Sequence, residues 1–178
     1  MIGHSLGGYV GLAFAEKYPD KLKGLGMFHS TAFADSEEKK QNRDKTMSFI
    51  ERNGVDLFAK SFVQPLFCKH RKETFAQEIA EAQEVVRQTP ITTILKATAA
   101  MKARPDRTHV LKNADYPILY IIGEQDLAVP LEQSKAQCHI PKKSIVHILK
   151  NVGHMGMIEE KEKSVDIIAA FAKLCNNS

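Results

Sequence analysis

The chain alternates between short apolar runs and longer stretches in which apolar positions recur at helical spacing. Three runs predict strands, at residues 24–29, 116–122 and 144–149. The run at 116–122 is apolar throughout, which is typical of a parallel strand covered on both faces. Helices are predicted at 9–18, apolar almost all round and ended by Pro19, and over about ten residues after Pro130. A last helix is predicted at 159–174, with Val165, Ile168 and Phe171 on one face.

The middle of the chain has a different pattern and no convincing strand. Asp35 and Ser36 resemble a helix cap, and the helix after them should close at Asn53-Gly54. Two more helices are predicted at 72–88 and 91–103. Residues 34–107 are therefore interpreted as an all-helical insertion between two core segments, 1–33 and 108–178. Strands separated by helices of crossover length indicate an α/β fold with a mostly parallel sheet.

Composition excludes several classes of protein without identifying one. The 178 residues are 43% hydrophobic, and the net charge of +4 is spread over interleaved lysines and acids, so no nucleic-acid surface is expected. No apolar run approaches the roughly 20 residues of a membrane helix, so no membrane association is expected. The three separated cysteines favour a reducing compartment and predict a cytoplasmic protein.

The first candidate for chemistry is the opening turn Gly3-His4-Ser5-Leu6-Gly7, which fits the pattern G-x-S-x-G. That spacing suits a sharp turn from strand to helix, which exposes the serine hydroxyl on a strained backbone. A helix that begins there also directs unpaired N–H groups toward whatever is bound to Ser5. The plainer interpretation is a tight turn in which Ser5 only caps the helix.

Two later segments favour the chemical interpretation. Asp126 lies just after the predicted strand 116–122, and His154 lies between Gly153 and Gly156 after the last predicted strand. Open α/β sheets place their functional groups at the carboxyl ends of their strands. Taken alone, Asp126 would be interpreted as a loop acid and His154 as a surface histidine. Together with Ser5 they give the order Ser, Asp, His, each after a strand.

On these three motifs the chain resembles the α/β-hydrolases, most of all the carboxylesterase and lactonase-like members with a helical cap. The resemblance implies Ser5 as nucleophile, His154 as general base and Asp126 as the acid that orients it. It implies the Leu6 backbone N–H as one oxyanion donor and a pocket that includes His4, Phe33 and Met155. It also implies a small-molecule acyl substrate and neither a metal nor an organic cofactor.

The implied activity is hydrolysis of a carboxylic ester, thioester or lactone. A serine at this turn disfavours the alkyl-ester chemistry of dehalogenases and epoxide hydrolases, which carry aspartate there. Acyl transfer, carbon–carbon bond hydrolysis and perhydrolysis remain alternatives on the same three residues. A hydrolase-fold binding protein or an inactive fragment is a further alternative.

Other residues are weaker candidates for the same chemistry. Asp35 is an alternative acid. It lies a few residues after the predicted strand at 24–29, and some family members take their catalytic acid from that position. Histidines without a glycine-framed loop are expected to have no chemical role; these are His29, His70, His109, His139 and His147. Cys68 and His70 are too isolated for a metal site, and Gly24-Leu25-Gly26 fails as a dinucleotide fingerprint because His29 replaces its last glycine. Aromatic and methionine residues of the insertion should form its core, with some facing an apolar pocket.

The chain also differs from the family that it resembles in the segment before the serine. Family members carry several strands before the serine, and the loop after their third strand supplies a second oxyanion donor. Here little more than Ile2 precedes the turn, so the chain is expected to be the C-terminal part of the fold. The expected consequences are an exposed apolar face on the first helix and an unpaired strand edge. Either an upstream segment, a second copy of the chain or a separate chain would complete the sheet.

Overall fold

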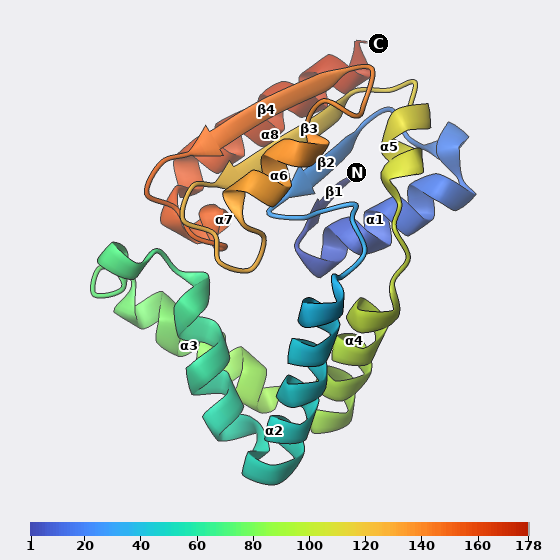
Figure 1. The fold of residues 1–178 in the computed structure, drawn as a ribbon. Helices are drawn as coiled ribbons and strands as arrows, with labels where there is room; N and C mark the ends of the chain where they lie inside the picture. Colours follow the sequence, from blue (N-terminus) through green and yellow to red (C-terminus); the bar gives the residue numbers. More distant parts are fainter. Residues whose placement is uncertain (178) are drawn as a thin grey trace.

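The computed structural model describes residues 1–177 and shows one parallel sheet of four strands (Figure 1). The strands are β1 (Ile2–His4), β2 (Leu25–Phe28), β3 (Ile118–Gly123) and β4 (Ser144–Leu149), adjacent in that order. In register, Gly3 lies beside Met27, and Phe28 lies beside Ile121. The predicted parallel sheet is confirmed, and the carboxyl ends of all four strands lie at the same edge.

Helices cover both faces of the sheet because the side chains of β3 alternate between two apolar layers. Ile118, Tyr120 and Ile122 pack with residues of α1 (Leu6–Lys17), α5 (Thr108–Asn113) and α6 (Leu131–Gln137). Leu119 and Ile121 pack against α8 (Lys161–Asn176), which lies behind the sheet in Figure 1. The core therefore consists of two layers that share the sheet.

Two helix faces differ from the predictions. The buried residues of α8 are Ser164, Ile167, Phe171 and Cys175, whereas Val165 is 56% exposed. Val165 and Ile167 are two positions apart, so on a helix they point to different sides, and the inclusion of Val165 in the buried face was wrong. Helix α1 is not buried all round either. Its Leu6 and Val10 are exposed beside the edge strand β1, as the expectation of an uncovered apolar face implied.

Between β2 and α5 the chain forms a helical segment, defined as Glu37–Ala103, that extends from the carboxyl edge of the sheet (Figure 1). It contains α2 (Glu37–Val63), α3 (Ala76–Gln88) and α4 (Ile91–Ala103). The Ser36 hydroxyl caps α2 by accepting the Lys39 N–H at 3.2 Å. The predicted break at Gly54 is real, with φ of 79° there, but a second helical stretch continues to Val63.

Short turns complete the connections. Single 3₁₀ turns occur at Pro19–Lys21, Gln64–Leu66 and Lys69–Arg71, and α7 (Gly156–Glu159) precedes α8. The backbone N–H of Arg107 donates to Ala32 O at 2.8 Å. This hydrogen bond joins the stretch of chain before the helical segment to the stretch after it. Among residues 1–177, no helix combines the length and apolar character that crossing a bilayer requires.

Candidate functional site

Ser5 lies at the junction of β1 and α1 with a strained backbone. Its φ is 51° and its ψ is −116°, a conformation that non-glycine residues rarely adopt. The turn requires close backbone approach, since a Cβ on Gly3 would lie 2.3 Å from Gly7 O. The Ser30 hydroxyl donates to Ser5 O at 2.8 Å and fixes the turn from the end of β2. The Ser5 side chain makes no capping hydrogen bond, so the interpretation of Ser5 as a simple helix cap was wrong.

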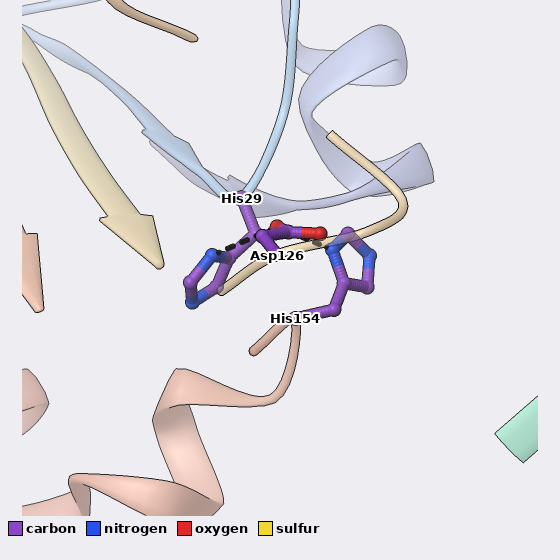
Figure 2. A group of neighbouring side chains, drawn as sticks. All are labelled: His29, Asp126 and His154. Atoms are coloured by element: carbon purple, nitrogen blue, oxygen red, sulfur yellow. Dashed lines mark hydrogen bonds and ion pairs between the residues drawn. The ribbon is translucent and has the colours of Figure 1, made fainter. Parts of the chain in front are cut away.

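Asp126 follows β3 and is buried, with both carboxylate oxygens occupied. Oδ1 accepts the backbone N–H groups of Ala128 at 2.8 Å and Val129 at 2.9 Å. Oδ2 lies 2.8 Å from Nδ1 of His154 and 3.2 Å from Nδ1 of His29, and Figure 2 shows the two rings on either side of the carboxylate. Burial alone would raise the pKa of Asp126, but the hydrogen bonds with His154 and His29 hold it well below its usual range. The carboxylate is therefore ionised at neutral pH.

His154 is held in the loop after β4 by contacts with the helical segment. Its backbone N–H donates to Leu66 O at 2.6 Å. The buried carboxylate of Glu159 accepts the N–H groups of Gly153 and Cys68, each at 2.8 Å, and burial raises the pKa of Glu159. A Cβ on Gly153 would lie 2.6 Å from Leu66 O, so glycine is required there. The loop that carries His154 and the helical segment are thus bound together at this point.

Ser5 and His154 line the same cavity, which has a volume of about 710 Å³. This volume is within the range of small-molecule sites. One wall is polar and comes from α2, where successive turns contribute Lys39, Asn42, Arg43 and Thr46. The apolar part of the lining includes Phe62, Leu66, Leu127, Val129 and Pro130.

The charged groups at the polar wall are mostly paired. Asp35 is buried and lies in ion pairs with Arg43 and, at 2.7 Å, with Arg104. Burial would raise the pKa of Asp35, but the two guanidinium groups hold it below its usual value. Burial lowers the pKa of Lys39, whose Nζ donates to Ala128 O at 2.9 Å. Arg43 and Arg104 share the Asp35 carboxylate, and Glu38 also lines the cavity, so the lining carries charges of both signs.

A second cavity, of about 720 Å³, lies away from these residues. It is lined by residues at the ends of α1 and α5, together with Tyr116, Pro117 and Cys175. Burial raises the pKa of the Cys175 thiol, which therefore stays protonated and unreactive at neutral pH. The first cavity is thus the one that contains a candidate nucleophile with a candidate base.

His29, Asp126 and His154 each offer a nitrogen or oxygen atom of the kind that binds metal ions, and these atoms lie within 4.8 Å of one another. Metal binding through Nδ1 of His29 would leave its proton on Nε2. That nitrogen faces the Gly156 N–H at 3.2 Å, so two donors would meet. A proton on Nδ1 also faces a backbone donor, the Gly123 N–H at 3.1 Å, but there it has the Asp126 carboxylate at 3.2 Å as an acceptor. The contacts of His29 therefore favour a proton on Nδ1 over a metal ion.

A family model described as the alpha/beta hydrolase fold matches residues 1–161. The chain belongs to the α/β-hydrolase fold family. Among solved structures, it superposes on a thermophilic esterase from Thermogutta terrifontis, solved with malate bound, with a TM-score of 0.90 and 28% identity. The match covers 98% of this chain and 64% of that one. The enol-lactonase from Burkholderia xenovorans LB400 gives a TM-score of 0.84 at 20% identity, covering 97% and 64% of the two chains.

Curated relatives of this α/β-hydrolase chain are similar along nearly its whole length. Lipase 1 of Psychrobacter immobilis is 25% identical, and the match covers 97% of this chain and 55% of the lipase. The 2-hydroxymuconate semialdehyde hydrolase of Pseudomonas sp. strain CF600 is 24% identical over 96% of this chain and 60% of that enzyme. The chain thus spans little more than half the length of these relatives.

The site residues expected of an α/β-hydrolase fall into two groups in the structure. Asp126 and His154 meet, and Ser5 lines the same cavity as His154. Leu6 begins α1, where the first N–H groups have no partner within the helix. His4, Phe33 and Met155 are absent from the cavity lining among residues 1–177, contrary to expectation. Asp35 lines the cavity but pairs with arginines, whereas Asp126 is the acid beside His154.

The three residues that do not line the cavity make other contacts. His4 Nε2 lies 2.8 Å from His154 O, and burial lowers the pKa of His4 to about 4. The carbonyl of Phe33 accepts a hydrogen bond from Arg104 at 3.0 Å. Met155 packs on the apolar cluster around Phe67. Each of the three is adjacent in the chain to a residue that does line the cavity, namely Ser5, Ala34 or His154.

His29 is the site residue that sequence reasoning missed. It has no glycine-framed loop, yet it is 1% exposed and contacts Asp126. The signal was topological, since His29 directly follows β2, and β2 lies beside β3, which Asp126 follows. The ends of adjacent parallel strands bring such residues together, whatever their separation in sequence.

Proposed function

We propose that this chain carries the catalytic residues of a serine hydrolase that cleaves a small-molecule carboxylic ester, thioester or lactone. The observation that carries the proposal is one cavity lined both by a serine with a strained backbone and by a histidine that is hydrogen-bonded to a buried aspartate. This arrangement supports nucleophilic catalysis, because a serine hydroxyl is a poor nucleophile without an adjacent base. Family membership and the similarity to an esterase and a lipase agree with it.

In this mechanism the proton on Nδ1 of His154 is held by Asp126, which leaves Nε2 to accept the proton of Ser5. The serine oxygen attacks the acyl carbon and forms a tetrahedral oxyanion, toward which the Leu6 N–H donates. The C–O or C–S bond then breaks, and the leaving group takes the proton from His154. A water molecule, deprotonated by His154, attacks the acyl-Ser5 ester, and collapse of that second intermediate releases the acid and restores Ser5.

The cavity walls refine the proposed substrate. An apolar pocket was expected, but α2 contributes Lys39, Asn42, Arg43 and Thr46 on one side. Aromatic lining from α2 is limited to Phe62 among the described residues. We therefore place the apolar part of the substrate against Phe62 and Leu66, and a polar or anionic group against Lys39 and Asn42 in the first two turns of α2.

Labelling with a fluorophosphonate tests the proposal directly, because the reagent phosphonylates a serine that an adjacent base activates. We expect the folded chain to be labelled and Ser5→Ala to remain unlabelled. Ser144→Ala is the matched control, since Ser144 is exposed on β4 and should leave labelling unchanged. Equal labelling of the Ser5→Ala variant, or no labelling of the folded wild-type chain, would contradict a Ser5 nucleophile.

Carbon–carbon bond hydrolysis is the second candidate, favoured by the similarity to 2-hydroxymuconate semialdehyde hydrolase. The same three residues would serve it, as they would acyl transfer or perhydrolysis. Product analysis separates these reactions. We expect release of a free acid from an ester, with little diversion of the acyl group when an alcohol, an amine or hydrogen peroxide is added as a competing nucleophile.

A further inference from the structure

His29 occupies a site built around its ring. It lies at the end of β2 with φ of 48°, and its ring is stacked on Phe28 with centroids 4.8 Å apart. Backbone surrounds the rest of the ring, because a Cβ on Gly156 would lie 2.5 Å from Nε2 and a Cβ on Gly123 would lie 2.9 Å from Cε1. The imidazole is therefore fixed beside Asp126 with no room to turn away.

The neighbours of the two ring nitrogens determine where the proton lies. Nδ1 faces Asp126 Oδ2 at 3.2 Å and the Gly123 N–H at 3.1 Å, and Nε2 faces the Gly156 N–H at 3.2 Å. With the proton on Nδ1, the ring donates to Asp126 and accepts from Gly156, and only the Gly123 contact is unsatisfied. With the proton on Nε2, only the Gly123 contact is satisfied. A doubly protonated ring would face backbone donors at both nitrogens.

We propose that His29 is a positioning residue for the catalytic acid: its neutral ring donates the Nδ1 proton to Asp126 Oδ2, the oxygen that also holds His154. This inference rests on the proposed serine hydrolase function. With this contact, Oδ1 of Asp126 accepts two backbone N–H groups, and Oδ2 faces two ring nitrogens, Nδ1 of His154 at 2.8 Å and Nδ1 of His29 at 3.2 Å, which holds the carboxylate toward His154. The second donor at Oδ2 also withdraws part of the negative charge that His154 would otherwise receive.

Charge near His29 comes from few groups. The titratable neighbours are Asp126 after β3, His154 after β4 and His4 on β1, whose ring centroid is 5.9 Å from that of His29. Burial lowers the pKa of both His29 and His4, which keeps the two rings neutral at neutral pH. His29 therefore acts on Asp126 as a hydrogen-bond donor rather than as a counter-charge.

The tautomer can be measured without any activity. Nitrogen-15 NMR of the histidine rings distinguishes a protonated Nδ1 from a protonated Nε2, and the spectrum of His29→Gln assigns the signals of His29. We expect His29 to remain a neutral Nδ1–H tautomer through neutral pH. A proton on Nε2 would overturn the proposal.

Two substitutions separate positioning from simple packing. The amide nitrogen of His29→Asn can take the place of Nδ1 and donate to Asp126, whereas that of His29→Gln corresponds to Nε2. We expect His29→Gln to lower kcat/KM by about tenfold, mostly through kcat, and to move the acid limb of its pH profile upward by up to about one pH unit. His29→Asn should restore most of the wild-type rate and profile.

The outcomes distinguish this proposal from the proposed function. Wild-type pH profiles in both folded variants would mean that His29 only packs, and would overturn its positioning role. If the folded wild-type chain does not react with fluorophosphonate while His29 keeps its Nδ1 proton, the serine hydrolase assignment fails and the hydrogen bond to Asp126 stands. A reactive wild-type chain with the proton on Nε2 would overturn the role of His29 alone.

Discussion

Asp126 and Asp35 are two buried carboxylates near the same cavity, and they differ in what surrounds them. Asp126, on the sheet side, accepts hydrogen bonds from backbone N–H groups and lies between two imidazoles. Asp35, beside α2, lies between two guanidinium groups. Both have a lowered pKa and are ionised at neutral pH. Because neutral donors hold Asp126 without cancelling its charge, Asp126 is the one of the two carboxylates that suits the proposed stabilisation of an imidazolium at His154.

The sharpest test of this difference is to neutralise each carboxylate separately. In the proposed serine hydrolase, Asp126→Asn should lower kcat/KM for an activated aryl ester by about 10⁴, because His154 loses its orienting anion. Asp35→Asn should keep kcat/KM within about tenfold of wild type while losing stability, since two largely buried arginines lose their partner. Steady-state kinetics and urea unfolding of both variants give the two values. A larger rate loss in Asp35→Asn than in Asp126→Asn would restore Asp35 as the catalytic acid.

How much of this site the sequence predicts depends on whether the signal is local. The strands at 116–122 and 144–149 were visible as apolar runs, and these runs end a few residues before Asp126 and His154. Ser5 was visible because its turn requires glycine neighbours. Each of these signals lies within a few residues of the side chain concerned, so sequence reasoning could find it.

His29 and the polar wall of the cavity required knowledge of the packing. His29 meets Asp126 only because β2 and β3 are neighbours, and strand order was not part of the sequence prediction. The glycines on either side of His154 are visible in the sequence, but the groups against which they pack are not. Gly153 packs against the backbone of the helical segment, and Gly156 packs against His29. Likewise, which face of α2 meets the cavity depends on the angle at which the helix leaves the sheet.

The imidazoles on the sheet side predict a loss of stability at mildly acidic pH, whereas the lowered pKa of Asp35 places the loss on the arginine-held side at lower pH. The pKa of His4 is lowered by burial from 6.5 to about 4, so the unfolded chain binds a proton more readily than the folded protein between those values. The contribution of neutral His4 to the free energy of unfolding is therefore fully present above about pH 6.5 and is lost as the pH falls toward 4. For His4 the loss is at most about 3 kcal/mol of unfolding free energy.

The variant His4→Gln sharpens this prediction, since glutamine can keep a donor to His154 O and does not titrate. Urea unfolding at pH 7 and pH 4.5 should show a smaller loss of stability in His4→Gln than in wild type. The exposed His139→Gln serves as the control and should behave as wild type. An equal loss in all three proteins would exclude His4 as its source.

The smallest expected effect concerns Lys39, a cation on α2 that lines the cavity. Lys39→Met removes one cation near the cavity and its hydrogen bond to Ala128 O, but leaves the contacts of Asp126 with Ala128 N and Val129 N in place. We expect KM for an aryl hemisuccinate, which carries a carboxylate, to rise about three- to tenfold, with little change in kcat and little change in KM for the neutral aryl butyrate. Added salt should reduce the difference between the two substrates, because partly exposed charges are screened within about 10 Å at 0.1 M ionic strength. Equal increases in KM for both esters, independent of salt, would mean that Lys39 only packs α2 against the Asp126 loop. The polar wall would then contribute shape rather than charge to the choice of substrate.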